Sequence, residues 1–416
     1  MIAALVIFSA TYLFLAGAEV PFLELDRPGG ALLGAAAMVV FGVLTPEQVY
    51  REAISWDTIV LLLGMMVLSS VMARAGIFRW ASFVAVRRAH GPRSLLGAVV
   101  AIAGLLSAFL VNDTVCVVCT PIIVAMVEAA SLPPLPFLLA LAFASNAGSV
   151  ATLTGNPQNM LIGTLSRIPY AHFSAALALP AILSVACVYL VLLIAFRRDL
   201  GAVRRVEVDV PPPQLHRFNA IACAGALAFV VVGFLLGYDL AWTALVGSAL
   251  LLVMTRGPPR EVLAQVDGTL LLFFAGLFVV THGVAQAGIA ERIFRALEPG
   301  FGSDAVQQTL RFGGFTVAAC QLVSNVPFVL LAGHWVPHFA DPRLAWLGLA
   351  LFSTLAGNLT PVASVANLIV LELAGRHGKV PFFQFIKIGA AATFLPLALA
   401  AACLLAERRL GLLPGP

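Results

Sequence analysis

The sequence predicts an all-α integral membrane protein with two inverted repeats of about five transmembrane helices, each containing a re-entrant hairpin and a broken helix. The prediction rests on composition, on apolar segments and on an internal repeat. Of 416 residues, 61% are hydrophobic and 11% charged, with 24 Lys or Arg against 20 Asp or Glu. A soluble domain carries about 25% charged residues, so a water-soluble enzyme and a disordered chain are both excluded. A net charge of +4 without a basic stripe argues against nucleic-acid partners.

Apolar segments long enough for the bilayer recur along the chain. A bilayer core about 30 Å thick needs about 20 apolar residues per helix. Complete spans are predicted at 2–18, 29–44, 57–74, 173–196, 218–237, 241–255, 267–287 and 383–406. Two further apolar regions contain polar and Gly/Pro interruptions, and each is expected to form a re-entrant hairpin and then a broken helix: 94–130 with 134–167, and 304–340 with 343–375. Such irregular backbone is tolerated only against protein or a water-filled cavity.

Basic residues in the connections predict an orientation. They gather after the third span and in the linker 197–217, which also holds the run Pro211-Pro212-Pro213: Arg74, Arg79, Arg87, Arg88 and Arg93, then Arg197, Arg198, Arg204, Arg205 and Arg217. By the positive-inside rule, this face is cytoplasmic and the N-terminus lies outside. The expected location is a bacterial-type inner membrane, with the lipid bilayer as a partner.

Landmarks of the first half recur in the second half at nearly one offset. Gly64 and Gly76 are matched by Gly276 and Gly288, 212 residues later. Asn112 pairs with Asn325, and Thr152 and Asn159 pair with Thr360 and Asn367. The repeats are 1–196 and 218–406, followed by a tail at 407–416. Five crossings per repeat invert the second copy, and an inverted repeat with matching helix breaks predicts a secondary transporter whose site lies near the midplane.

Two polar clusters interrupt the first repeat. Asn112-Asp113-Thr114 is placed at the hairpin tip, and Asp113 is the only carboxylate among all the clusters. Charges within a membrane usually mark ion or proton pathways, so Asp113 is the candidate for proton or cation coupling. The alternative is that Asp113 only caps the second hairpin helix. The second cluster runs from Ser145 to Asn159 and supplies neutral oxygens and amides that suit a hard cation or an oxyanion; its candidate ligands are Asn146, Ser149, Thr152, Asn156 and Asn159.

The second repeat carries matching clusters without a carboxylate. Its candidate ligands are Ser324 and Asn325 at the hairpin tip, and Asn358, Thr360, Ser364 and Asn367 in the broken helix. Half-helix N-termini at these breaks would favour an anion. A sodium ion is expected near Asn112, Asp113, Thr152, Asn325 and Thr360. No nucleotide loop and no nucleophile–base pair is visible, so a transport protein is expected and not an enzyme, with Na⁺ or H⁺ as coupling ion and no other cofactor.

These motifs resemble the ion transporter superfamily. The resemblance rests on Ser107-Ala108-Phe109-Leu110-Val111-Asn112-Asp113-Thr114, on Gly155-Asn156-Pro157-Gln158-Asn159 and on Gly357-Asn358-Leu359-Thr360-Pro361. The superfamily joins arsenite permeases, sodium/proton antiporters and citrate-transporter-like divalent anion/sodium symporters. In the symporters a Ser-Asn-Thr triplet at each hairpin tip binds sodium and substrate carboxylates, and only Asn112, Thr114, Ser324 and Asn325 correspond here. Asn112-Asp113 is similar to the arsenite-permease branch, whereas the run 155–159 is similar to less characterised citrate-transporter-like permeases.

The resemblance implies an elevator mechanism and a homodimer. The expected function is ion-coupled secondary active transport of a small inorganic or organic anion. Proton-coupled efflux of arsenite or antimonite, a metalloid substrate, is the nearest alternative. An anion channel is the alternative from another class.

Overall fold

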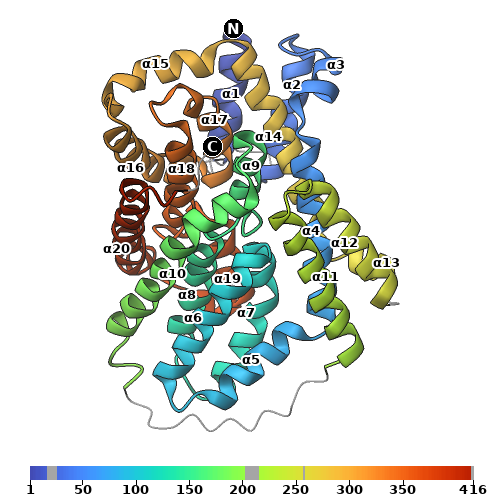
Figure 1. Ribbon diagram of the computed structural model, residues 1–416, viewed down its shortest axis with the longest axis vertical. Coiled ribbons are helices and arrows are strands. Elements are labelled where there is room, and N and C mark those ends of the chain that lie inside the picture. The colour runs from blue at the N-terminus through green and yellow to red at the C-terminus, as the bar shows by residue number, and fades with distance from the viewer. Residues whose placement is uncertain (16–25, 202–214, 256–257, 414–416) are drawn as a thin grey trace.

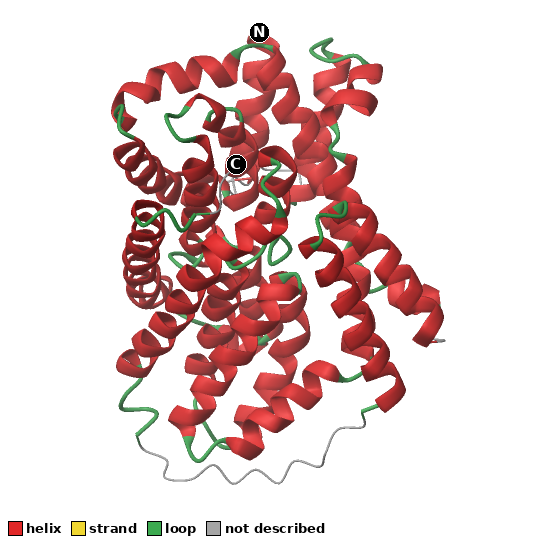
Figure 2. Cartoon of the chain, viewed as in Figure 1, coloured by secondary structure: helices red, strands yellow, loops and turns green. Residues whose placement is uncertain are grey.

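The computed structural model describes residues 1–15, 26–201, 215–255 and 258–413, and these form helices and their connections without a β-strand (Figure 2). The all-α prediction is therefore confirmed. The end of the span predicted at 2–18, the middle of the linker with Arg204, Arg205 and the proline run, and the last residues of the tail lie outside the described residues.

The helices of the first half are interrupted where the polar clusters lie. Its long elements are α1 (Ile2–Leu15), α2 (Arg27–Val40), α4 (Trp56–Arg74), α5 (Ile77–Arg88), α6 (Pro92–Phe109), α7 (Asn112–Ala129), α8 (Pro134–Ser149), α9 (Pro157–Ser166) and α10 (Tyr170–Ala195). Two short elements, α3 (Pro46–Gln48) and the π-helix η1 (Val49–Ala53), precede α4.

The second half follows the same plan. It contains α11 (Arg217–Leu235), α12 (Leu240–Thr255), α13 (Pro259–Leu263), α14 (Gly268–Gln286), α15 (Ile289–Phe301), α16 (Ala305–Val323), α17 (Asn325–Gly333), α18 (Pro342–Ala356), α19 (Val365–Leu373) and α20 (Phe382–Arg409). Short 3₁₀ turns are η2 (Val336–His338), η3 (Pro361–Ala363) and η4 (Gly375–Gly378).

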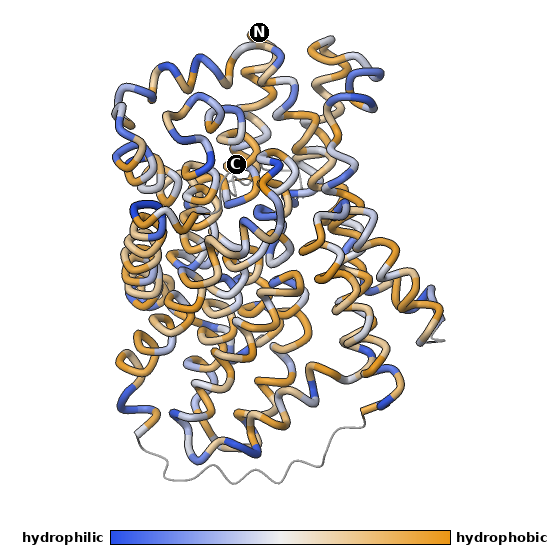
Figure 3. Tube along the Cα trace, in the orientation of Figure 1, coloured by the Kyte–Doolittle hydropathy of each residue, from blue (hydrophilic) through white to orange (hydrophobic). Residues whose placement is uncertain are grey.

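Seven described helices are long and apolar enough to cross a bilayer: α4, α6, α7, α10, α11, α14 and α20. Shorter apolar helices, including α1, α2, α8, α12 and α18, pack among them. Hydrophobic residues dominate the middle of the bundle, whereas hydrophilic stretches gather along α15 and near the linker ends (Figure 3). The protein is therefore a multi-pass membrane protein.

Local chemistry explains where the helices break. Asn156 is the N-cap of α9, and its side-chain oxygen accepts a hydrogen bond from the Asn159 N–H at 2.8 Å. Pro157 then occupies the first helical position, where its missing N–H costs nothing. In the second hairpin, α16 ends and α17 begins at Ser324, which has a φ of 69°.

Close contacts between the two halves are reciprocal. Helix α4 of the first half packs on α12 of the second half, and α14 of the second half packs on α2 of the first half. In the same way, α7 packs on α19, and α17 packs on α9. Gly64 of α4 lies at the contact with α12, and Gly276 of α14 lies at the contact with α2. A Cβ on Gly64 would lie 2.8 Å from the carbonyl carbon of Ala244, and one on Gly276 would lie 2.8 Å from that of Ala31. The absence of a side chain therefore allows both pairs of helices to approach closely.

The two ends of the bundle differ. Helix α5 and the described ends of the linker lie at one end, named here the linker face, and α15 and the N-terminus lie at the opposite end, the α15 face (Figure 1). The chain turns into α5 at Gly76 (φ 83°) and into α15 at Gly288 (φ 69°). Both glycines adopt the left-handed conformation that a side chain disfavours.

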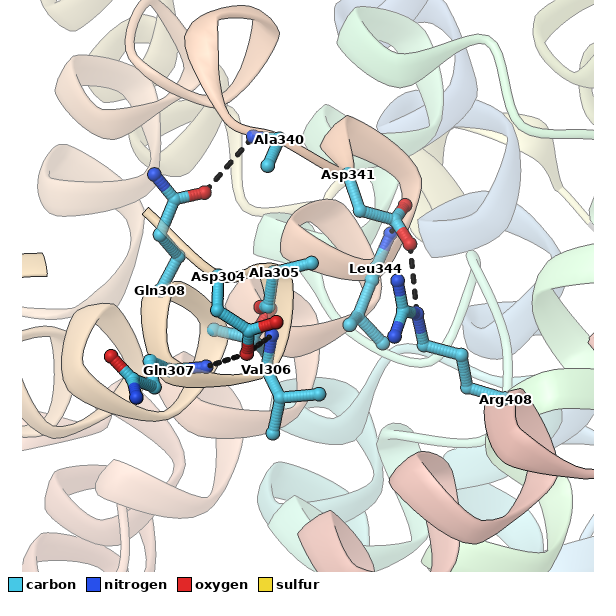
Figure 4. Close-up of polar contacts among 10 residues, drawn as sticks. Asp304, Ala305, Val306, Gln307, Gln308, Ala340, Asp341, Leu344 and Arg408 are labelled. Carbon is cyan, nitrogen blue, oxygen red and sulfur yellow. Dashed lines mark hydrogen bonds and ion pairs between the residues drawn. The ribbon is translucent and has the colours of Figure 1, made fainter. Parts of the chain in front are cut away.

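Polar contacts anchor the base of the second hairpin (Figure 4). Asp304 caps α16 by accepting hydrogen bonds from the N–H groups of Val306 and Gln307. The Gln308 amide oxygen accepts from the Ala340 N–H at 2.9 Å. Asp341 caps α18 and forms an ion pair with Arg408 of α20, with 2.9 Å between Oδ2 and Nε. The start of α16 and the end of α20 are thereby tied to the loop before α18.

Candidate functional site

Four helix N-termini line one small cavity of about 40 Å³. They belong to the helices that follow the breaks: α7 (Asn112, Asp113), α9 (Pro157, Gln158), α17 (Asn325, Val326) and α19 (Val365, preceded by Ser364). The first N–H groups of a helix have no partner within it, and each N-terminus carries about half a positive charge. Their convergence makes the cavity electropositive.

Two charged side chains of opposite sign also line this cavity. Arg27, at the start of α2, is half-buried and donates to the Val362 carbonyl oxygen at 3.5 Å. Asp113 lies in the first turn of α7. Its carboxylate forms no hydrogen bond or ion pair with any residue that the structure describes.

The capping role considered for Asp113 is wrong. The N-cap of α7 is Val111, and no side chain caps this helix. Asp113 is the second residue of α7 and lines the cavity, so it accepts no capping hydrogen bond, although its charge still favours the positive end of the helix dipole.

Asn146 connects the two halves through its amide. Its Oδ1 accepts from Asn112 Nδ2 at 3.1 Å and from Ser364 Oγ at 3.2 Å. Its Nδ2 donates to Asn358 Oδ1 at 2.9 Å and to Asn367 Oδ1 at 3.3 Å. Asn146 is 1% exposed, so these four contacts replace its hydration.

Equivalent asparagines stabilise the two broken helices in the same way. Asn159 Nδ2 donates to the carbonyl oxygens of Ser149 and Thr152, both at 3.0 Å. Asn367 Nδ2 donates to the carbonyl oxygens of Gly357 and Thr360. Each asparagine therefore satisfies carbonyl groups that the break in the preceding helix leaves free.

Several buried oxygens at the site have no hydrogen-bond partner. They include Oδ1 of Asn112 and Oδ1 of Asn325, at the tips of the first and second hairpins, both of which line the cavity. A buried acceptor without a partner costs about 1–3 kcal/mol. Amide oxygens in this state are ready ligands for a hard cation or for a bound water.

The structure brings together most of the predicted residues, with three exceptions. The predicted residues that line the cavity are Asn112, Asp113, Ser324, Asn325 and Ser364. Asn146, Ser149, Asn156, Asn159, Asn358 and Asn367 form the buried network behind it.

The threonines of the predicted set lie elsewhere. Thr114 lines a separate, larger cavity and not this one. The hydroxyls of Thr152 and Thr360 donate to the Ala108 carbonyl oxygen and to Gln321 Oε1. They brace the hairpin tips in this structure and do not line the cavity.

Four residues of the site were absent from the sequence prediction. Arg27 lies far from the polar clusters in sequence, so nothing local signals its role. Gln158 lines the cavity and donates to Thr354 Oγ1, and Gln321 receives the Thr360 hydroxyl. Thr354 lies 208 residues after Asn146, the same offset that separates Asn159 from Asn367, so the predicted repeat is the sequence signal that could have pointed to it.

A bundle of apolar helices whose breaks bring four helix N-termini to one cavity is the arrangement expected of a secondary transporter. Comparison with known families agrees. The chain belongs to the citrate transporter family, whose model matches residues 3–345. The resemblance to the ion transporter superfamily is thereby confirmed, and the protein is a membrane transporter of small solutes or anions.

Relatives cover nearly the whole chain. The putative transporter arsB of Dictyostelium discoideum is 26% identical over 90% of this chain and 86% of its own. The silicon efflux transporter LSI3 of Oryza sativa subsp. japonica is 30% identical over 92% and 93%. An uncharacterized transporter of Mycobacterium tuberculosis is 30% identical over 96% and 97%.

Two solved structures share the fold. The YdaH transporter of Alcanivorax borkumensis aligns with a TM-score of 0.60 at 18% identity, covering 99% of this chain and 98% of that one. MtrF of Neisseria gonorrhoeae, from a class of antimetabolite efflux pumps, aligns with a TM-score of 0.58 at 13% identity, covering 96% and 93%. At these identities the likeness concerns the fold alone.

Proposed function

We propose that this protein is an ion-coupled secondary active transporter that carries a small inorganic or organic anion across a bacterial-type inner membrane. The observation that supports the proposal most directly is the convergence of four helix N-termini on one cavity that also holds Asp113 and two unpartnered amide oxygens. The helix N-termini suit an anion, and Asp113 with the two amide oxygens suits a cation.

Electrostatics and size favour a small anion. Four N-termini at about half a charge each, together with Arg27, outweigh the single negative charge of Asp113. A water molecule needs about 10–15 Å³ of such space, so 40 Å³ holds about three water-sized groups. In this conformation a small oxyanion fits, whereas a tricarboxylate such as citrate is too large.

The hairpin tips supply ligands for the coupling ion. Oδ1 of Asn112 and Oδ1 of Asn325 lack partners, and Asp113 lies beside Asn112 with its carboxylate free among the described residues. Neutral amide oxygens with one carboxylate suit Na⁺, and the carboxylate by itself suits H⁺. A cation held here also offsets the charge of the anion, which couples the binding of the two.

The reciprocal contacts support an inverted repeat. A two-fold relation between the halves produces contacts that occur in matching pairs. The contacts α4–α12 and α14–α2 form one such pair, and α7–α19 and α17–α9 form another. In the proposed elevator mechanism, the hairpins and broken helices (α6–α9 and α16–α19) slide as a unit against α1, α2, α4, α11, α12 and α14. A homodimer contact formed by these scaffold helices would keep the scaffold stationary while the other helices move. Native mass spectrometry of the protein in lipid nanodiscs measures the oligomeric state.

Metalloid efflux is the second candidate, because relatives named for silicon efflux and for arsB cover most of the chain. Arsenite resistance conferred on a sensitive host, abolished by Asp113→Asn, would favour it. A channel is the third candidate, and it cannot accumulate substrate against an electrochemical gradient.

Transport in proteoliposomes tests the proposal. Uptake or release of phosphate, arsenite and silicate is measured under an imposed sodium gradient, an imposed proton gradient and neither. Accumulation driven by one gradient supports coupled transport, and indifference of all three solutes to both gradients contradicts it.

Asp113→Asn gives the residue-level prediction. It removes the only carboxylate that the described part of the chain brings to the cavity, so coupled transport should fall at least tenfold and its dependence on the driving gradient should disappear. Asp57→Asn is the matched control, since Asp57 is exposed in the first turn of α4. If Asp113→Asn and the control retain the same gradient dependence, Asp113 has no coupling role.

A further inference from the structure

A second cavity lies on the other side of the first hairpin tip. It measures about 520 Å³ and is lined by α4, α5, α7 and the segment before α14. Its polar lining groups are Ser70, Arg74, Arg79, Thr114 and Gln265. Because α5 and the end of α4 belong to the linker face, we name it the linker-face cavity (Figure 1).

Consecutive residues of the hairpin tip separate the two cavities. Asp113 lines the small cavity and Thr114 lines the linker-face cavity. Adjacent residues of a helix point about 100° apart, so the first turn of α7 presents one residue to each space. The first hairpin tip is thus the wall between them, and a solute in the larger cavity lies one helix turn from the site.

The charge of the linker-face cavity is positive. Arg74 pairs with Glu261 of α13 at 2.6 Å, which offsets its charge. Arg79 is exposed and has no hydrogen-bond or ion-pair partner within the described ranges. No acidic side chain of the described residues lines the cavity, so the guanidinium of Arg79 provides an uncompensated charge beside the hydroxyls of Ser70 and Thr114.

The fold does not require an arginine at this position. Arg79 is the third residue after Gly76, and the third residue after the matching Gly288 is Glu291, at the α15 face. The same turn into an amphipathic helix therefore accepts either charge. The turn and the helix packing do not set the charge at this position.

We propose that the linker-face cavity is an anion-binding vestibule in which Arg79 collects a small oxyanion before it passes the first hairpin tip. The proposal rests on the proposed transport function for its purpose, but the binding itself does not require transport.

Thiol labelling tests the vestibule without any transport measurement. Gln265→Cys places an exposed thiol at the edge of the cavity, while five of the six native cysteines are buried. Its modification rate is measured with an anionic and with a neutral thiol reagent, and the unsubstituted protein gives the background. Arg79→Gln should lower the anionic-to-neutral rate ratio about threefold, the effect of one unit charge at roughly 7 Å in water.

Arg87→Gln is the matched control, because Arg87 lies on the same helix, stacks over the Phe83 ring at 5.7 Å and does not line the cavity. Inorganic phosphate or sulfate should protect the Gln265→Cys thiol, and Arg79→Gln should abolish the protection. Vesicles of phosphatidylcholine alone and vesicles containing phosphatidylglycerol distinguish a free oxyanion from a lipid headgroup. Equal rate ratios for the two arginine variants, absence of protection by either anion, or protection only by the anionic lipid would each overturn the proposal. Gradient-driven transport can fail in these vesicles without affecting this result.

Discussion

Replacement of Asn146 by alanine is the most informative single change for the packing of the two halves. The side chain makes four hydrogen bonds, to Asn112, Ser364, Asn358 and Asn367, and three of these partners belong to the second half of the chain. Asn146→Ala removes all four at once. Because the residue is 1% exposed, bulk water does not reach the groups that lose these partners.

The expected magnitude follows from the acceptors that lose their donors. Asn358 Oδ1 and Asn367 Oδ1 each receive a hydrogen bond from Asn146 Nδ2, while their own Nδ2 groups remain bonded to carbonyl oxygens. Asn112 Nδ2 and Ser364 Oγ also lose their acceptor, but both residues line the cavity, where water can accept their hydrogen bonds. The two orphaned acceptors at about 1–3 kcal/mol each then give a loss of about 2–6 kcal/mol. With the unfolding entropy per residue of globular proteins, this is a fall of roughly 2–7 °C in Tm for a chain of this length.

Thermal unfolding in detergent, followed by circular dichroism, measures this loss. Ser69→Ala is the control: Ser69 is fully buried, and its hydroxyl bonds only to the Met65 carbonyl oxygen within α4. The control should lose about 1 kcal/mol or less. If Asn146→Ala unfolds at the same temperature as Ser69→Ala, the network around Asn146 does not hold the halves together and the reasoning is refuted.

Two further predictions concern stability. Gly276→Ala should destabilise the protein by about 1–3 kcal/mol, because the new Cβ meets the backbone of Ala31 at 2.8 Å, whereas Gly268→Ala on the same helix has nothing within 4 Å and should stay within about 0.5 kcal/mol. Thermal unfolding of the two variants side by side decides this, and equal midpoints would contradict it. Arg408→Gln breaks the half-buried ion pair with Asp341 at the base of the second hairpin and should cost about 1–2 kcal/mol, more in low salt than in high salt. Proteolysis of the loop before α18 measures the loosening, and an unchanged rate would show that this pair is dispensable.

The helix breaks could be read from the sequence because they are local events. Asn156-Pro157 carries its own N-cap and its own first helical residue, so the start of α9 is encoded within two positions. The hairpin tips at Asn112 and Asn325 were likewise marked by polar residues inside apolar runs. The sequence did not show whether Asp113 caps α7, and the structure places the N-cap at Val111, two residues earlier.

The site required contacts that no local pattern encodes. Arg27 reaches the cavity from a helix remote from every polar cluster. Thr114 was grouped with Asp113 because the two are adjacent, yet the helical twist sends them to different cavities. The repeat offset relates Thr354 to Asn146, but sequence by itself does not show that Asn156 and Gln158 donate to the Thr354 hydroxyl.

The sequence by itself determined that this chain lies in a membrane, which segments are helical and where four of those helices stop. It did so because apolar length, capping residues and proline act within a few residues of their own position. Only the tertiary structure decided that the four interrupted helices point their N-termini at one cavity, and that one amide, that of Asn146, joins the halves. Those properties depend on distances between residues more than 200 positions apart, which are set by the packing of whole helices.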